Sequence, residues 1–131
     1  MEAYLAWTPT PVLKLRADYT YTEARDTTLN SRLLRRPANK LSGDAQWQVL
    51  PQFSVGATLL YVSGAVDVGR ESFLTLKDPD YVTANLSVNY ALTDMFTLYG
   101  RADNLFNEVY QNPNGFLQPG LGFYAGIKAT L

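Results

Sequence analysis

Residues 12–23, VLKLRADYTYTE, decide the fold class of this chain. Apolar side chains occupy every second position of the stretch, namely Leu13, Leu15, Ala17, Tyr19 and Tyr21. Polar or charged side chains fill the positions between them, beginning with Lys14 and Arg16. Successive side chains of a β-strand point to opposite faces of its sheet. The stretch therefore predicts a strand with one apolar face and one polar face.

The same period of two recurs along the chain and predicts an all-β fold without helices. Seven strands are expected, over residues 2–8, 12–23, 41–49, 53–62, 82–90, 96–106 and 121–131. The contrast between the two faces is weak in 96–106 and blurs at Leu60 and Val62. No stretch reaches the roughly 20 consecutive apolar residues that a transmembrane helix needs.

The connections between these strands alternate in length. Residues 9–11, 50–52 and 93–95 form tight turns, whereas residues 25–37, 64–80 and 107–119 form long polar links. In a meander with this alternation, all the short turns fall at one end of the sheet. Transmembrane β-barrels show that asymmetry, with short periplasmic turns and long extracellular loops. Strands of about 11 residues also match the apolar band of a membrane, which is roughly 25 Å tall.

The composition argues against several functions. The 131 residues carry 11 basic and 12 acidic side chains, so the chain lacks the basic excess of a nucleic-acid-binding protein. It has no cysteine and no histidine, which removes disulfides, thiol catalysis, the commonest metal ligand and the usual general base. We therefore expect no enzyme activity, no catalytic residue, no cofactor and no metal site.

The period of two does not by itself say which face of the sheet is enclosed. A soluble β-barrel or β-sandwich that binds a small apolar ligand has strands of the same period, with the apolar side chains inside. The strands are longer than the roughly 5 to 6 residues usual in soluble sheets, which favours a membrane barrel. Small residues in the middle of the apolar faces, such as Gly43 and Ala57, favour it too, because a soluble core needs bulk there. On the pattern alone, both alternatives stay open.

Residues 100–110, GRADNLFNEVY, carry a more specific pattern. Asn104, Leu105, Phe106 and Tyr110 resemble the NLF-(D/N)-x-x-Y signature on the penultimate strand of TonB-dependent outer-membrane receptors. Residues 119–131 are similar to the closing strand of that family, and residues 35–39, RRPAN, to the R-R-P motif before a descending strand. Together these segments extend the resemblance over most of the chain.

The resemblance implies a transmembrane barrel of about 22 strands around a plugged lumen, in the outer membrane of a Gram-negative bacterium. Such receptors import scarce nutrients such as a ferric siderophore or cobalamin, driven by TonB acting on the plug. Residues 1–131 would form a single segment, an antiparallel up-and-down meander of the C-terminal strands. The sequence shows no signal peptide and no plug domain. We therefore expect a fragment of a receptor, not competent for transport alone.

The resemblance also assigns residues to places in the barrel. Residues of the polar face are expected to line the lumen: Lys14, Arg16, Asp18, Asp44, Arg101, Asp103 and Lys128. A basic cluster in an outer loop consists of Arg32, Arg35 and Arg36. These guanidinium groups either bind phosphates of lipopolysaccharide or an anionic ligand, or they belong to an ordinary loop and are solvated by water.

The last strand and the signature complete the expected sites. Alternate residues of the last strand resemble the signal that the barrel-assembly machinery recognises: Phe123, Ala125, Ile127, Ala129 and Leu131. The signature is expected to be structural, with Asn104 turning the backbone and Phe106 and Tyr110 in an interfacial belt. The expected partners are outer-membrane lipid and lipopolysaccharide, the barrel-assembly machinery, the missing strands and plug, and TonB through that plug only.

Overall fold

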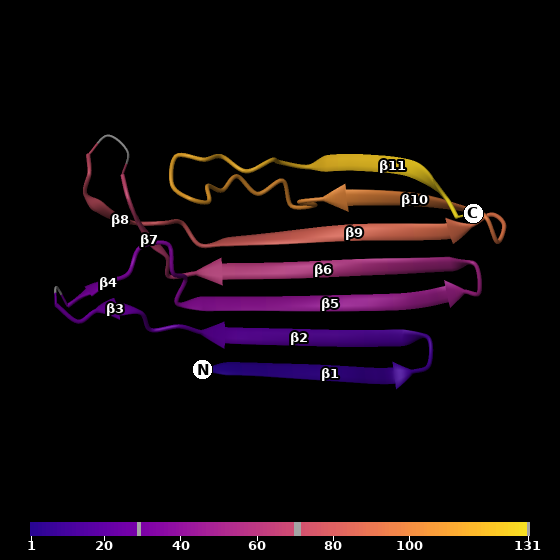
Figure 1. Cartoon of the computed structure of the whole chain (residues 1–131), viewed down its shortest axis with the longest axis horizontal. Helices are drawn as coiled ribbons and strands as arrows, with labels where there is room; N and C mark the ends of the chain where they lie inside the picture. The colour runs from indigo at the N-terminus through magenta and orange to yellow at the C-terminus, as the bar shows by residue number, and fades with distance from the viewer. Residues whose placement is uncertain (29, 70–71, 131) are drawn as a thin grey trace.

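A computed structural model describes residues 1–28, 30–69 and 72–130, and these residues form an antiparallel sheet of seven long strands (Figure 1). The strands follow one another across the sheet in chain order, which confirms the predicted up-and-down meander. They are β1 (Glu2–Thr10), β2 (Leu13–Tyr21), β5 (Asn39–Leu50), β6 (Phe53–Ser63), β9 (Tyr81–Ala91), β10 (Phe96–Asp103) and β11 (Gly122–Ala129).

The short turns lie at one end of the sheet and the long links at the other, as predicted (Figure 1). Pro11 and Pro51 occupy two of the turns, where the missing N–H costs no ladder hydrogen bond. Pro9 lies inside β1 rather than in a turn, at a place where the pairing with β2 shifts between Trp7 and Thr10. A proline within a strand is tolerated at such an irregularity.

Two of the long links contain small hairpins that the sequence pattern does not predict. The link between β2 and β5 forms β3 (Arg25–Asp26) and β4 (Ser31–Arg32), and the link between β6 and β9 forms β7 (Val66–Val68) and β8 (Thr75–Lys77). In Figure 1 they lie beyond the same end of the sheet. We call these two segments and the segment between β10 and β11 the first, second and third outer links.

The strand predicted over residues 96–106 ends earlier, at Asp103. The next residue, Asn104, has a φ of 51° and Asn107 has a φ of 49°. These values lie in the left-handed region, which interrupts a strand and which asparagine tolerates better than most residues. Leu105 and Phe106 therefore lie in a turn and not in the penultimate strand.

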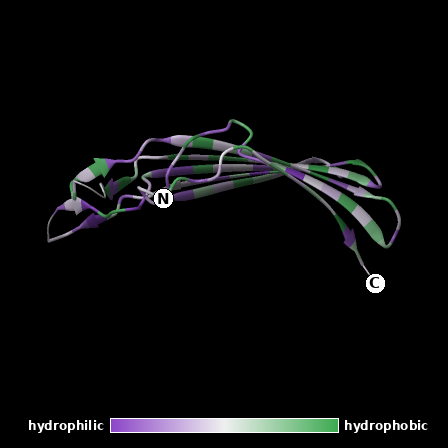
Figure 2. Cartoon of the chain, turned by 90° about the horizontal axis from the view of Figure 1, so that it is seen from above, coloured by the Kyte–Doolittle hydropathy of each residue, from purple (hydrophilic) through white to green (hydrophobic). Residues whose placement is uncertain are grey.

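The pairing register confirms that each strand has one apolar and one polar side. One row across the sheet joins apolar or small residues: Leu5, Ala17, Gly43, Leu59 and Ala84. The next row along the strands joins Ala6, Arg16, Asp44, Thr58 and Asn85. Directly paired residues point to the same face, so the alternation within each strand adds up to two contrasting faces. Figure 2 shows the alternation as coloured bands along the strands.

The sheet forms a single curved layer when it is viewed from above (Figure 2). Within the described ranges, the buried apolar residues are Ala38, Val62 and Ala102. Large apolar side chains on the apolar face stay open, such as Trp47 at 50% exposure and Ile127 at 66%. The alternative of a soluble module that encloses an apolar ligand is therefore not supported, since nothing in the described residues covers this face. The described residues contain no helix long and apolar enough to cross a membrane.

Candidate functional site

The polar face carries all seven residues that the sequence assigns to a lumen. Arg16 lies opposite Asp44 in the register, and Lys14 lies opposite Gln46. At the other side of the sheet, Arg101 lies opposite Tyr124 and Thr97 opposite Lys128. Asp18 and Asp103 follow Arg16 and Arg101 two positions later on the same faces. The structure thus brings these residues onto one surface, while their place inside a barrel stays a prediction.

Two copies of the tripeptide Arg-Ala-Asp organise the charge on this face. Arg16 binds Asp18 through Nε, 2.7 Å from Oδ2, and Nη2, 2.7 Å from Oδ1. Arg101 Nε lies 3.1 Å from Asp103 Oδ2. Residues two apart on a strand share a face, which makes both ion pairs possible. The repeat is visible in the sequence but was not among the predicted features.

The third outer link folds back over the polar face and creates a hollow of about 550 Å³. Strands β6, β9, β10 and β11 supply residues such as Thr58, Asn85, Arg101 and Tyr124 to its walls, and the link supplies Tyr110. The guanidinium carbon of Arg101 lies 4.7 Å from the centre of the Tyr124 ring, a cation–π contact. The hollow offers hydrogen-bond donors and acceptors and the Arg101–Asp103 ion pair beside apolar and aromatic side chains.

Asn104 of the signature holds the start of the third outer link. Its side chain donates to the carbonyl oxygens of Glu108 (2.9 Å) and Pro119 (3.1 Å) and accepts from the Glu108 N–H (2.9 Å). Its own N–H donates to Asn85 Oδ1 at 2.9 Å. The residue is 5% exposed, so these bonds satisfy a buried amide. This geometry agrees with the expected structural role.

The aromatic and apolar members of the signature divide between two places. Tyr110 stacks on Tyr81, with ring centres 4.2 Å apart, and lines the hollow on the polar face. The expected place of Tyr110 in an interfacial belt stays a prediction, and this geometry puts its ring beside the polar face. Leu105 and Phe106 are 40% and 59% exposed in the turn that follows β10.

The three arginines of the first outer link do not form one free cluster. Arg32 Nη1 donates to the Gly64 carbonyl at 3.3 Å. Arg35 Nε donates to both carboxylate oxygens of Asp67, at 3.1 and 3.0 Å. Two of the three guanidinium groups thus contact the second outer link. Binding of an external anion by Arg32, Arg35 and Arg36 together stays a prediction, and the geometry favours a structural use of Arg35.

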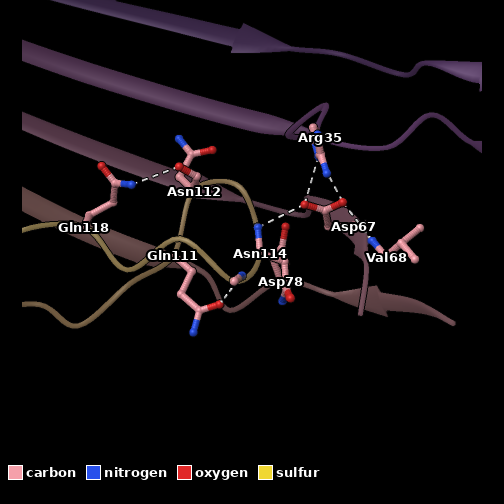
Figure 3. A network of polar contacts seen from close by, with 9 residues as sticks. Arg35, Asp67, Val68, Asp78, Gln111, Asn112, Asn114 and Gln118 are labelled. Carbon is pink, nitrogen blue, oxygen red and sulfur yellow. Dashed lines mark hydrogen bonds and ion pairs between the residues drawn. The ribbon is translucent and has the colours of Figure 1, made fainter. Parts of the chain in front are cut away.

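Asp67 lies at the centre of a polar network that joins the outer links (Figure 3). The residue has no solvent exposure. Besides Arg35, its carboxylate accepts from the N–H of Val68 at 2.8 Å and from the N–H of Asn114 at 3.0 Å. Burial acts to raise the pKa of Asp67, but these hydrogen bonds and the Arg35 charge outweigh it and hold the pKa below its usual value. Asp67 was not among the predicted site residues, because one acid between two valines carries no motif.

The predicted assembly signal lies on the apolar face of β11. Phe123 and Ile127 are 73% and 66% exposed, and Ala125 lies between them on the same side. Ala129 ends the strand opposite Phe96. Leu131, the last residue of the predicted signal, lies outside the described residues. No group of three or more metal-ligating side chains occurs in the described part of the chain.

Comparison with known proteins identifies this type of sheet. The family model for the β-barrel of TonB-dependent receptor-like proteins matches residues 1–105. The iron-regulated outer membrane virulence protein of Vibrio cholerae is 27% identical over 134 residues, which cover 96% of this chain and 20% of that protein. The chain therefore spans about a fifth of the length of this relative.

Solved structures show the same fold. A ferric enterobactin receptor variant from Pseudomonas aeruginosa, in complex with enterobactin, superimposes with a TM-score of 0.78 at 21% identity. The ferripyoverdine receptor of the outer membrane of P. aeruginosa superimposes with a TM-score of 0.81 at 19% identity. Each match covers 98% of this chain and, respectively, 22% and 19% of the solved chain.

The sheet, its register and these matches together define the class of protein to which the chain belongs. The chain belongs to the TonB-dependent receptor-like β-barrel family. The resemblance seen in the sequence is thereby confirmed. Because the matched relatives are receptors, the prediction that this chain is not an enzyme is confirmed as well.

Proposed function

We propose that the chain forms part of the wall of a TonB-dependent receptor in the outer membrane of a Gram-negative bacterium. In this proposal the apolar face meets lipid, and the polar face lines the lumen. The observation that carries it is the register, which places apolar residues on one face and the Arg-Ala-Asp pairs on the other across the whole sheet. In a transmembrane barrel, lipid-facing and lumen-facing residues alternate in this way.

Further strands would complete the wall at the two edges of the sheet. In the described residues, β1 and β11 each have a strand partner on one side only. Unpaired backbone groups in the hydrocarbon layer cost several kcal/mol each, so a membrane position requires strands that pair with both edges. The coverage of 19–22% of the related chains agrees with a segment of a larger barrel.

Leu59 and Leu60 test the assignment of the two faces, because they are identical neighbours on opposite faces. Leu59 lies opposite Gly43 and Ala84, whereas Leu60 lines the polar hollow. The chain has no cysteine, so a nitroxide spin label can be attached at Leu59→Cys or Leu60→Cys in the membrane-assembled protein. With oxygen, which dissolves in lipid, we expect the label at Leu59→Cys to relax faster than the label at Leu60→Cys. With a water-soluble nickel chelate, we expect the label at Leu60→Cys to relax faster. Equal or reversed accessibility would contradict the proposal.

The proposed cargo is an iron-loaded siderophore. The support comes from the relatives, which include an iron-regulated outer membrane protein and receptors solved with enterobactin and ferripyoverdine. Cells that lack the receptor containing this chain should lose uptake of at least one radiolabelled ferric siderophore, and the restored gene should return it. Normal uptake of every ferric siderophore tested, with loss of cobalamin uptake instead, would assign the cargo differently.

The remaining partners belong to the same proposal. The plug would contact the polar face, and TonB would act only through the plug. Lipopolysaccharide would surround the outer ends of the strands, and the barrel-assembly machinery would recognise the apolar residues of β11. The exposed, alternating side chains Phe123 and Ile127 support the last of these roles.

A further inference from the structure

Asp67 occupies an unusual position for a carboxylate, because it has no solvent exposure while few other described residues are buried. Its partners come from all three outer links. Arg35 belongs to the first link, Val68 to the second link together with Asp67 itself, and Asn114 to the third. These segments are separated by 32 and 47 positions along the chain, and Figure 3 shows them meeting at the carboxylate.

The two oxygens of the Asp67 carboxylate accept hydrogen bonds from different links. Oδ1 accepts from Val68 N at 2.8 Å, and Oδ2 accepts from Asn114 N at 3.0 Å. Arg35 Nε lies within 3.1 Å of both oxygens. A buried charge is stable only when such partners replace water, so the folded position of each partner link depends on the others.

The links also make contacts with one another outside this carboxylate. Arg35 N donates to the Val66 carbonyl at 2.8 Å, which ties the first link to the second. Asn114 Nδ2 reaches Asp78 Oδ1 at 3.4 Å, close to the limit for a hydrogen bond. Among the described hydrogen bonds and ion pairs, those of the Asp67 carboxylate join all three links at a single group.

We infer that Asp67 is a latch that makes the three outer links move as one unit. The term latch denotes the Asp67 carboxylate with Arg35 and the N–H groups of Val68 and Asn114. The inference deepens the proposed function, on which it rests for placing the links outside the membrane. In a receptor wall, the latch would transmit a displacement of one link to the other two, so that the outer rim over this part of the barrel opens or closes together.

The latch makes two links depend on Asp67 in different ways. Asp67→Asn removes the charge that holds both Arg35 and the Asn114 N–H, so it should loosen the first and the third link, although the Arg35 N–H keeps its bond to the Val66 carbonyl. Arg35→Ala removes only the side-chain contact with the first link, and the N–H of Asn114 keeps its partner. Asp80→Asn is the matched control, because Asp80 is a carboxylate of the same link whose contacts stay within that link, with Gly64 N and Lys77.

Distances between spin labels test this pattern in the membrane-assembled protein. Labels at Thr27→Cys, Thr75→Cys and Leu117→Cys report on the first, second and third links, and all three side chains are exposed. Asp67→Asn should broaden both the 27–75 and the 75–117 distance distributions. Arg35→Ala should broaden only the first of them, and Asp80→Asn neither. Unchanged distributions in a folded Asp67→Asn protein would overturn the latch.

Hydrogen exchange of single amides provides a second measurement. In Asp67→Asn, the Asn114 amide should exchange at least about tenfold faster, as expected when a hydrogen bond to a charged group is lost. The Gln118 amide, which donates to the Tyr110 carbonyl within the third link, should keep its rate. Equal acceleration at both amides would show general unfolding of the link instead of release of a latch. These readouts use no cargo. Normal uptake of every ferric siderophore, or reversed accessibility of the labels at Leu59 and Leu60, would therefore count against the proposed function, whereas only the distance and exchange results decide the latch.

Discussion

Gly126 shows how a single residue without a side chain fits the polar face. It pairs with Tyr99 of the neighbouring strand, and a Cβ atom at Gly126 would lie 2.5 Å from the Tyr99 hydroxyl oxygen and 2.6 Å from its Cζ. The tyrosine ring therefore covers the glycine backbone. A bare glycine in a strand weakens it, and an aromatic partner across the strands compensates for the missing side chain.

Substitution of this glycine should therefore depend on its partner. Gly126→Ala forces the half-exposed Tyr99 ring away and should lower the free energy of unfolding by about 1 kcal/mol, the order of the cost of moving a side chain off its preferred rotamer. In a Tyr99→Ala background, the same change meets no ring and should cost little. Denaturant unfolding of the four proteins of this double-mutant cycle measures the difference. A similar cost of Gly126→Ala in both backgrounds would mean that the ring does not occupy this space.

At the scale of elements, the strands were predictable and the links were not. The period of two in residues 12–23 predicted a strand that the structure gives as Leu13–Tyr21, and the pairing of Arg16 with Asp44 confirms the polar side. The sequence pattern loses its contrast at Leu60. The structure places this residue on the polar face, where it lines the hollow. The two faces of each strand meet different environments, so apolar and polar residues alternate along it. A long strand repeats this alternation often enough for it to be recognised in the sequence.

Neither the small hairpins nor the latch could be predicted from the sequence pattern. β3 and β4 have two residues each, too few for a period to appear. Asp67 gains its importance from Arg35 and Asn114, which are far away in the sequence. Asn104 was recognised through the signature, but its left-handed backbone and its bonds to Glu108 and Pro119 are three-dimensional facts.

The last strand yields a prediction about assembly. Ile127 points to the apolar face and Lys128 to the polar face of β11. In the intact receptor, Ile127→Asp should reduce the amount of folded protein in the outer membrane, because a carboxylate replaces an apolar group that faces lipid and belongs to the proposed assembly signal. Lys128→Asp is the control with the same new residue on the other face and should assemble nearly normally. Heat-dependent gel mobility of the outer-membrane fraction measures folded receptor, and equal loss for both variants would refute the role of the apolar face.

At the scale of the whole molecule, the latch gives the outer rim a dependence on pH. The pKa of Asp67 is held below the ordinary value of 3.8. A group with a lowered pKa contributes its stability above the unfolded value, and this contribution is lost as the pH falls through the folded value. The charged groups that face Asp67 are Arg35 and Asp78. Burial raises the pKa of Asp78, so the contribution of Asp78 has the opposite sign, present at low pH and lost as it ionises.

The spin labels on the three outer links can follow this dependence. As the pH falls from neutral, the wild-type distance distributions should stay narrow past the ordinary aspartate pKa of 3.8, and they should broaden only at lower pH, where Asp67 becomes protonated. The Asp67→Asn protein should already be broad at neutral pH and show no further transition from this residue. A transition of equal size in both proteins would assign the effect to other carboxylates.

The odd number of strands in the sheet fixes the relative direction of its two edge strands. Seven antiparallel strands leave β1 and β11 running the same way (Figure 1). Copies of this sheet joined edge to edge would meet in a parallel seam, and pairing β1 with β1 of an inverted copy would send the long links to opposite sides of a membrane. An all-antiparallel ring has an even number of strands. Any segment that completes such a ring with this sheet must therefore contribute an odd number of strands.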